Sequence, residues 1–179
     1  VLFSAKEGVL VWDGYRFSKI DEIPYLSQVC VIYKDPVDKS LLFGTGLGLY
    51  HLKDGKMAHY PQFTAEAQGI VEGIVRESDG AYWLSAGRGV AYFDGTNVTR
   101  VSDTLISSGF TFTLVRDNKG GLWVTSEEGL FYKGKNADSF IHALPEHINV
   151  TANSIIMMDS SRILAGRLTD VCIIDLDKF

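Results

Sequence analysis

Residues Tyr82–Val101, YWLSAGRGVAYFDGTNVTRV, decide how this chain folds. The stretch holds a short apolar strand, a turn at Ala86-Gly87-Arg88, an aromatic strand that begins at Gly89 and a second turn at Asp94-Gly95. Short strands bounded by turn residues are typical of all-β proteins. No part of the chain keeps a helical period over a full helix length, so we expect an all-β fold.

The same pattern recurs along the chain. The other copies are Leu2–Phe17 (LFSAKEGVLVWDGYRF), Leu42–Tyr60 (LFGTGLGLYHLKDGKMAHY) and Leu122–Tyr132 (LWVTSEEGLFY), with a degraded fifth copy at Ile163–Leu176. The repeated glycines Gly8, Gly48, Gly89 and Gly129 stand 40, 41 and 40 residues apart, and Asp170 lies near that place in the fifth copy. A period near 40 residues with four strands per unit is typical of β-propeller blades.

This register predicts one β-propeller segment over residues 1–179, an arc of about four to five blades. The predicted blades are residues 1–24 (partial), 25–64, 65–106, 107–148 and 149–179 (partial). The predicted inner strands are Val29–Asp35, Val71–Glu77, Thr111–Asp117 and Asn153–Asp159. The first blade then lacks its inner strand and the last lacks its fourth strand, so we expect open strand edges and a larger parent propeller.

Recurring aromatic side chains are expected to pack between blades. Phe3, Phe43, Trp83 and Trp123 are predicted to share one blade position. The two cysteines, Cys30 and Cys172, lie in apolar strands and are expected to be small buried hydrophobes, since no spacing favours a disulfide.

Composition excludes two classes of protein. The chain has 179 residues, 46% of them hydrophobic, and a net charge of −5 with acids and bases interspersed. A nucleic-acid surface needs clustered Lys and Arg, which are missing here. No apolar run is long enough to cross a bilayer.

The repeats resemble the "two-component regulator propeller" repeat, whose core reads roughly Leu-Trp-Ile-Gly-Thr, two variable residues, Gly-Leu and an aromatic strand. Leu122–Thr125 with Gly129–Tyr132 fits it, and so does Leu42–Thr45 with Gly48–Tyr50. The aspartates that end three inner strands, Asp35, Asp117 and Asp159, fit as well, whereas Glu77 is a mild departure. The fifth copy departs most, because it lacks the Trp.

The resemblance implies a function. It implies the periplasmic sensor region of a Bacteroides-type hybrid two-component histidine kinase, a homodimer with seven-bladed propellers and an immunoglobulin-like domain that regulates polysaccharide use. The kinase and receiver modules would lie outside this segment. Its ligand would be a glycan fragment, and no catalysis, cofactor or metal is expected in the segment itself.

A propeller binds ligands mainly at one end of its central channel, where loops converge. The candidate ligand-binding residues in those loops and in the inner strands are Arg88, Arg167, Tyr25, Gln28, Gln68, Glu72 and Glu127. Arg88 and Arg167 could hold a carboxylated or sulfated sugar through forked hydrogen bonds, and Tyr25 could stack on a sugar ring. An ordinary exposed loop residue is the alternative for each. Lys34, Arg76 and Arg116 repeat at one blade position and are interpreted as structural or solvated.

Other chemistry finds little support. Gly44-x-Gly46-x-Gly48 is followed by a strand and not by the helix that a phosphate loop needs, so we interpret it as a hairpin. The four histidines, His51, His59, His142 and His147, show no metal-ligand spacing. Two alternatives to a sensor stay open: a scaffold for protein contacts, and a streptogramin-lyase-like propeller enzyme, which needs a His base and a metal-binding acid at the channel mouth.

Overall fold

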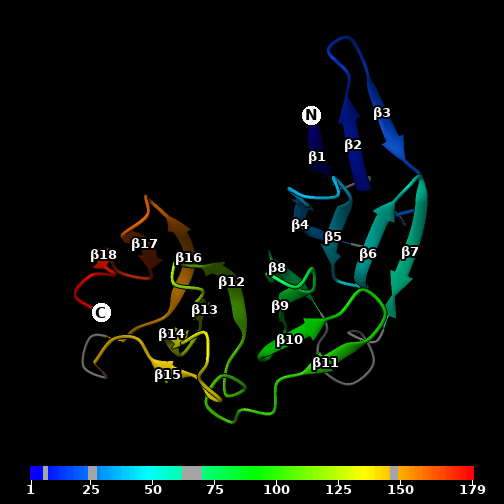
Figure 1. The fold of residues 1–179 in the computed structure, drawn as a ribbon. Helices are drawn as coiled ribbons and strands as arrows, with labels where there is room; N and C mark the ends of the chain where they lie inside the picture. Colours follow the sequence, from blue (N-terminus) through cyan, green and yellow to red (C-terminus); the bar gives the residue numbers. More distant parts are fainter. Residues whose placement is uncertain (6–7, 24–27, 62–69, 146–148) are drawn as a thin grey trace.

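The structure is a computed structural model that describes residues 1–5, 8–23, 28–61, 70–145 and 149–179. These residues form five separate antiparallel sheets and no α-helix. Among them, no helix combines the length and the apolar character that crossing a membrane would require. In Figure 1 the sheets follow one another around an arc in chain order. The chain is therefore an arc of a β-propeller, as the repeats predict.

Each sheet is built from consecutive strands. The first sheet holds β1 (Leu2–Ala5), β2 (Gly8–Trp12) and β3 (Phe17–Ile20). The second holds β4 (Val29–Lys34), β5 (Leu41–Thr45), β6 (Gly48–Lys53) and β7 (Lys56–Tyr60). The third holds β8 (Val71–Arg76), β9 (Tyr82–Ala86), β10 (Val90–Phe93) and β11 (Val98–Arg100). The fourth holds β12 (Thr111–Arg116), β13 (Leu122–Ser126), β14 (Gly129–Lys133) and β15 (Ile141–His142). The fifth holds β16 (Ala152–Met157), β17 (Arg162–Arg167) and β18 (Val171–Asp175).

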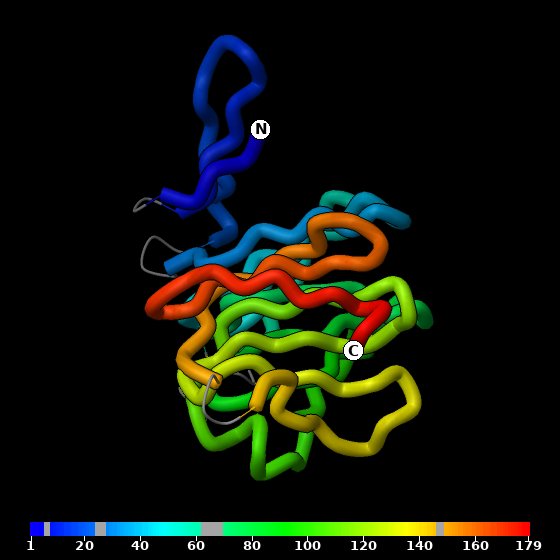
Figure 2. The backbone as a smooth tube through the Cα atoms, turned by 90° about the vertical axis from the view of Figure 1, so that its left-hand side faces the viewer, coloured from blue at the N-terminus to red at the C-terminus, as the bar shows by residue number. Residues whose placement is uncertain are grey.

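The first strand of each later sheet lies innermost. Strands β4, β8, β12 and β16 line the inner side of the arc, and each contacts the next (Figure 1). The first sheet has no strand in that place, and Figure 2 shows this sheet projecting from the body of the molecule. The three-stranded first and last sheets match the missing inner and fourth strands that the sequence register predicts.

Apolar side chains are buried between neighbouring sheets. The four hydrophobic clusters correspond to the four successive junctions along the arc. For example, Leu42 and Leu49 of the second sheet pack with Ile74 and Leu84 of the third. A sheet that lies between two other sheets is covered on both faces. Its strands are therefore apolar on both sides, unlike strands of a sheet with one face in water.

Hairpin chemistry explains the repeated glycine. Gly8, Gly48, Gly89 and Gly129 all have φ between +97° and +114°, a region that L side chains rarely adopt. Asp170, which stands in place of this glycine in the fifth copy, is not among the described non-glycine residues with positive φ, which are Gln28, Lys39 and Asp54. The backbone of the fifth hairpin therefore differs from that of the other four.

The Asp-Gly turns are not all alike. Asp54 and Gly55 both have positive φ and join Lys53 to Lys56 in a two-residue hairpin. The predicted two-residue turn at Asp94-Gly95 is wrong, because Phe93 pairs with Val98 and leaves a four-residue loop. In that loop Asp94 Oδ1 accepts hydrogen bonds from the backbone N–H groups of Thr96 and Asn97, which takes the place of the tight turn.

The strand register corrects the prediction that the four recurring aromatics share one blade position. Phe43 pairs with Tyr50, two residues after the hairpin glycine, whereas Trp123 pairs with Tyr132, three residues after it. Phe43 therefore points toward the first sheet and Trp123 toward the fifth, since a one-residue shift moves a side chain to the other face. Phe3 has the same strand register as Phe43, and Trp83 has the same register as Trp123. The four aromatics therefore occupy two blade positions and not one.

The cysteines are both free thiols. Cys172 is half-buried, as a small hydrophobe should be, but Cys30 is exposed, so its predicted burial is wrong. Cys30 lies on β4, the innermost strand next to the place where the first sheet lacks a strand.

Trp123 provides a test of the packing between the fourth and fifth sheets. Its ring is fully buried, lies against Tyr132 and Phe179, and donates Nε1–H to Asp117 Oδ2 at 2.8 Å. We expect Trp123→Ala to lower the free energy of unfolding by about 3–5 kcal/mol in urea denaturation, because a large cavity replaces the indole. Tyr15→Ala is the control, since Tyr15 is 93% exposed, and it should change stability little. Equal effects of the two substitutions would contradict the assigned packing.

Candidate functional site

The inner side of the arc has two ends. At one end, which we call the mouth end, the hairpin loops at residues 46–47, 87–88, 127–128 and 168–169 form backbone hydrogen bonds to the residues just before the inner strands, Gln28, Ile70, Phe110 and Thr151. The turns that follow the inner strands gather at the opposite end, which we call the turn end. The predicted ligand residues belong mainly to the mouth end.

Arg88 is an exposed residue of the mouth end, in the loop after β9. Its Nη1 donates a hydrogen bond to the Ser108 carbonyl at 2.9 Å, and its guanidinium carbon lies 5.1 Å from the centroid of the Phe110 ring. This cation–π distance restricts the side chain while leaving other guanidinium N–H groups exposed. The hydrogen bond and the aromatic contact thus hold the arginine in a defined direction, and among the described residues it forms no ion pair.

Glu127 joins the same group from the next sheet. Its Oε2 accepts a hydrogen bond from the Phe110 N–H at 3.1 Å, and its own N–H donates to the Phe110 carbonyl at 3.0 Å. Phe110 therefore contacts both Arg88 and Glu127. Two of the predicted ligand residues, separated widely in sequence, come together on one aromatic residue that the sequence prediction did not include. No pattern distinguishes Phe110 from the other apolar residues that begin inner strands.

Arg167 is already compensated. Its Nε and Nη2 donate to the two carboxylate oxygens of Asp170 at 2.6 and 2.5 Å, and its side chain is 12% exposed. The Asp170 hydrogen bond raises the pKa of Arg167. The aspartate that replaces the hairpin glycine in the fifth copy thus neutralises this arginine, which leaves it less suited than Arg88 to an anionic sugar.

The inner strands bulge near the mouth end. The pairing register shifts by one residue or more between Val29 and Val31 in β4 and between Val71 and Gly73 in β8. Equivalent shifts occur in β12 and β16. Bulges re-aim side chains and are frequent beside binding sites. The bulged residues Cys30 and Glu72 are two such side chains, and both come from strands that line the inner side of the arc.

The charge of Glu72 acts on Cys30. Burial raises the pKa of the Glu72 carboxyl. Although Cys30 is exposed at the surface, neighbouring atoms partly shield its thiol from water, and this partial desolvation raises the pKa of the thiol, with a smaller contribution from the negative charge of Glu72. Gln28, just before β4, has φ +48° and accepts a hydrogen bond from the Gly46 N–H at 3.1 Å through its carbonyl. The remaining predicted residues, Tyr25 and Gln68, lie outside the described residues.

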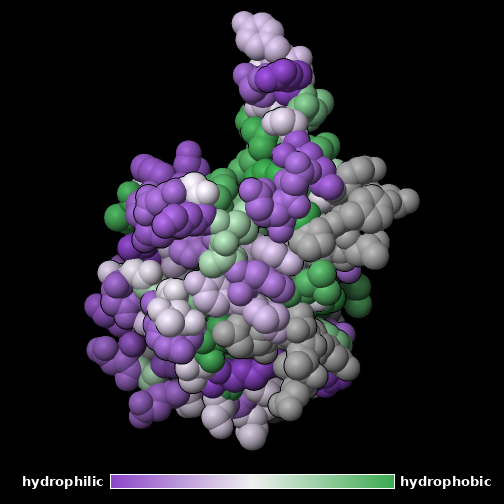
Figure 3. Space-filling view, turned by 90° about the vertical axis from the view of Figure 1, so that its right-hand side faces the viewer, coloured by the Kyte–Doolittle hydropathy of each residue, from purple (hydrophilic) through white to green (hydrophobic). Residues whose placement is uncertain are grey.

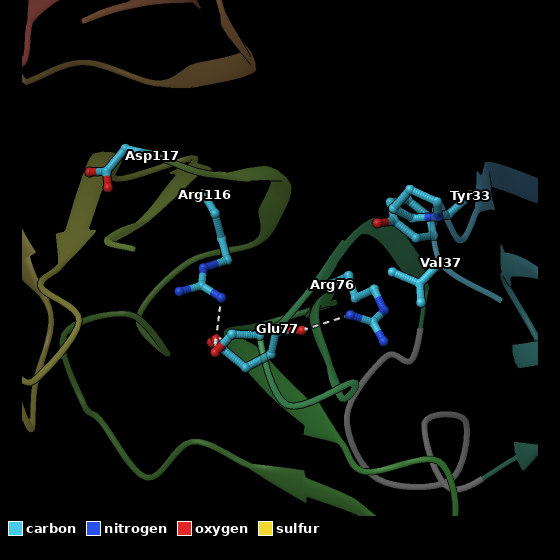
Figure 4. Close-up of a pocket in the computed structure, with 8 residues that line it drawn as sticks. Tyr33, Val37, Arg76, Glu77, Arg116 and Asp117 are labelled. Carbon is cyan, nitrogen blue, oxygen red and sulfur yellow. Dashed lines mark hydrogen bonds and ion pairs between the residues drawn. The ribbon is translucent and has the colours of Figure 1, made fainter. Parts of the chain in front are cut away.

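A cavity lies at the turn end. It has a volume of about 380 Å³ and is lined by Tyr33, Pro36, Val37, Arg76, Glu77, Ser78, Arg116 and Asp117. Figure 4 shows Arg76 and Arg116 reaching toward Glu77, which lies between them. The lining charges come in opposite pairs, so the two arginines are not a free anion site.

Asp35 anchors the first of these ion pairs. Its buried carboxylate accepts hydrogen bonds from Arg76 Nε at 2.8 Å, from the Tyr82 hydroxyl at 2.6 Å and from the Val37 N–H at 2.6 Å. Burial by itself would raise the pKa of Asp35, but these hydrogen bonds and the Arg76 charge lower it overall. The carboxylate at the end of β4 is therefore held ionised by the next sheet.

Glu77 repeats the arrangement one sheet further on. Its carboxylate binds Arg116 of the fourth sheet and accepts a hydrogen bond from Trp83 Nε1 at 2.9 Å. Burial opposes ionisation, but the hydrogen bonds from Ser78 and Trp83 and the Arg116 charge lower the pKa of Glu77 overall. Arg76 and Arg116 are thus structural, which is one of the two interpretations, structural or solvated, that their repeat allowed. What the sequence analysis missed is that each arginine binds the carboxylate of the preceding sheet.

The described histidines lie on outer strands. His51 is buried on β6. His59 on β7 contacts the Leu47 carbonyl of a mouth-end hairpin loop through Nε2 at 2.8 Å, and His142 on β15 contacts Asn149 Nδ2 at 2.8 Å, while His147 is outside the described residues. Burial lowers the pKa of His51. In the part of the chain that the structure describes, no three His, Cys, Asp or Glu side chains are grouped so that they could hold a metal ion.

Comparison with solved structures identifies similar folds. The chain is similar to the extracellular domain of a protein described as a hybrid two-component system, BT3049 from B. thetaiotaomicron, with a TM-score of 0.73 and 18% identity over 97% of this chain and 27% of that one. A second such domain, that of BT4673, has a TM-score of 0.64 and 14% identity over 83% of this chain and 20% of that one. A streptogramin B lyase has a TM-score of 0.66 and 11% identity over 96% of this chain and 62% of the enzyme.

These similarities are similarities of fold. The chain spans 27% of the length of the first of these structures. No protein-family model matches the sequence, and neither does any curated protein.

Removing the Asp35 carboxylate should destabilise the fold. Asp35→Ala leaves the Arg76 and Tyr82 donors without their acceptor, so we expect the free energy of unfolding in urea to fall by about 3–5 kcal/mol. Asp159→Ala is the matched control. Asp159 follows β16, the inner strand of the fifth sheet, but its carboxylate pairs with Arg162 in an exposed position. Asp159→Ala should lower the free energy of unfolding by much less. A comparable loss in both variants would contradict a special role for Asp35.

The same carboxylates predict a dependence on pH. The pKa values of Asp35 and Glu77 are lowered in the folded chain, so their contribution is complete above the ordinary pKa values, about 3.9 and 4.3, and is lost as the pH falls through the folded values. The thermal midpoint should therefore fall on acidification from about pH 6 to about pH 3. Asp35→Asn should make this fall shallower, and an unchanged slope would contradict the assignment.

Proposed function

We propose that this chain is a ligand-sensing segment of the extracytoplasmic region of a hybrid two-component signalling protein. The observation that carries the proposal is the fold match over 97% of the chain to an extracellular domain described as belonging to such a system. The in-register repeats that resemble the two-component regulator propeller give independent support. The parent protein would be a histidine kinase of the inner membrane, and this segment would lie in the periplasm.

The proposed ligand is a glycan fragment bound at the mouth end. Arg88, Phe110 and Glu127 supply the three kinds of group that recognise sugars: a forked donor, an aromatic face and a carboxylate acceptor. Arg88 favours glycans that carry a carboxylate or a sulfate, since a guanidinium binds both through paired hydrogen bonds. Glu72, half-buried on the inner side of the arc, would contact the part of the ligand that enters deepest.

Signalling would follow from differential affinity. A ligand shifts an equilibrium only as far as it binds one state better than the other. In the proposed homodimer, a glycan at the mouth end would favour one arrangement of the two sensor regions and so bias the kinase modules, which lie outside these residues.

The proposal assigns no catalysis to this segment. A propeller lyase needs a histidine base at the channel mouth, and the described histidines lie on outer strands instead. The fold match to a streptogramin B lyase makes metal-dependent turnover of streptogramin B the measurement that would revive this alternative.

Calorimetry on the intact extracytoplasmic region tests the proposal. Titration with a panel of neutral, carboxylated and sulfated oligosaccharides should give binding heat for at least one charged glycan. Arg88→Met should weaken that affinity roughly tenfold to hundredfold, the worth of a hydrogen bond to a charged group. Arg16→Met is the control, because Arg16 is an exposed arginine in the loop between β2 and β3.

Silence across the whole panel would count against a glycan sensor. If a pull-down with the same region then captured a protein partner and no small ligand, the scaffold alternative would replace the proposal. If Arg88→Met and Arg16→Met weakened binding equally, the ligand site could not be assigned to the mouth end.

A further inference from the structure

The hairpin that carries Arg88 is held by an arginine of the outermost strand of the same sheet. Arg100, the last residue of β11, donates from Nη1 to the Arg88 carbonyl at 2.6 Å and from Nη2 to the Ala86 carbonyl at 2.9 Å. The carbonyl between these two, that of Gly87, accepts a hydrogen bond from the Thr111 N–H at 2.9 Å. Each carbonyl of residues 86–88 therefore has a donor, and Arg100 supplies two of the three.

Two other outermost strands also reach back to a hairpin. The side of the molecule on which β3 and β7 lie in Figure 1 is mostly hydrophilic below the projecting first sheet (Figure 3), as exposed rim strands should be. On β7, His59 contacts the Leu47 carbonyl through Nε2 at 2.8 Å. On β15, Asn149 Nδ2 joins the His142 ring to the Glu128 carbonyl, with contacts of 2.8 and 2.9 Å. The residues that pair two places after the repeated glycine are His59, Arg100 and His142.

The hairpins of the second and fourth sheets also have a support of their own. Thr45 Oγ1 accepts a hydrogen bond from the Leu47 N–H at 3.0 Å, and Ser126 Oγ accepts one from the Glu128 N–H at 2.9 Å. Both hydroxyl residues stand three places before the repeated glycine. A side-chain hydroxyl that binds the backbone two residues on stabilises a turn locally, so these two hairpins depend less on the outermost strand.

The hairpin of the third sheet lacks this hydroxyl. Its residue three places before the repeated glycine is Ala86. Gly87, which follows, has φ +60°, a region that L side chains rarely adopt. The loop therefore relies on donors from outside, and the fork of Arg100 provides two of them. Because a side chain leaves the backbone at Cα, the place of the Arg88 guanidinium depends on how firmly this loop is held.

We propose that Arg100 is a positioning residue of the mouth end: it fixes residues 86–88 so that Arg88 lies over Phe110 before a ligand arrives. The rigid fork of a guanidinium can span two carbonyls at once, which a lysine cannot do. A group that is already held loses less conformational freedom on binding, so the fork raises the affinity of Arg88 for an anionic ligand. The inference rests on the proposed function for its ligand, whereas the hold on the loop is measured without one.

Hydrogen exchange on the intact extracytoplasmic region, without ligand, tests the hold on the loop. Arg100→Met keeps much of the aliphatic stem and removes both donors. Exchange at the amides of residues 86–90 should then become about tenfold faster, which corresponds to the loss of one or two hydrogen bonds. Arg100→Lys, which can satisfy one carbonyl at a time, should give an intermediate rate.

His59→Phe is the matched control in the second sheet. The new ring can still stack on Tyr50, which His59 contacts at 4.1 Å between ring centroids, but it removes the contact with the Leu47 carbonyl. Because Thr45 supports this hairpin from within, exchange at residues 45–48 should rise much less than exchange at residues 86–90 does in Arg100→Met.

A double-mutant cycle tests the link to the ligand. The probes are a uronic-acid disaccharide and a sulfated disaccharide, titrated by calorimetry into the same region. Arg100→Met should weaken the binding of a charged probe about threefold to tenfold when Arg88 is present. The same substitution should change nothing when Arg88 is already replaced by methionine, because a positioning residue acts only through the residue that it holds.

Three outcomes would overturn the inference. Unchanged exchange at residues 86–90 in Arg100→Met would mean that the loop holds itself. Equal acceleration of the two hairpins by Arg100→Met and His59→Phe would remove the special dependence on Arg100. A loss of affinity that persists in the Arg88→Met background would make Arg100 a direct contact of the ligand. If neither disaccharide binds, the proposed function fails for these probes, and the exchange rates alone decide the role of Arg100.

Discussion

Each sheet of this molecule depends on a neighbour on both of its faces. The strands are short and apolar on both sides, so a single sheet would expose most of what it needs to bury. Stacking the sheets around an arc buries Leu42 and Leu84 at one junction and Trp123 and Ile163 at another. The same dependence explains why the terminal sheets show exposed apolar groups such as Ile156 and Ile173, which an additional sheet would cover.

Carboxylates at the ends of the inner strands fix the position of one sheet relative to the next. Asp35 and Glu77 each accept hydrogen bonds from an aromatic side chain and from an arginine of the following sheet. Apolar packing tolerates small slips between sheets, but a buried carboxylate with several donors does not. The turn end is thereby committed to structure, and the ligand site that we propose lies at the opposite, mouth end, with its bulged strands and exposed loops.

The candidate site shows the limits of a sequence-based prediction. Arg88 and Glu127 could be placed at the mouth end because hairpin loops of successive repeats must converge there. Phe110, which contacts both, could not be identified, since its role depends on a contact across two sheets. Arg167 looked equivalent to Arg88 in the repeat, yet Asp170 compensates it, because a changed residue in the same hairpin brought a carboxylate within reach.

The sequence by itself determined the propeller, its order of sheets and the strands missing at both ends, because a 40-residue period and left-handed glycines are local properties that repeat. It also separated Arg76 and Arg116 from the ligand residues, as structural or solvated. Only the tertiary structure decided that Phe43 and Trp123 face opposite neighbours, that Cys30 is exposed, and that each arginine reaches the carboxylate of the sheet before it. These facts depend on a one-residue register and on contacts between sheets, and no local pattern encodes either.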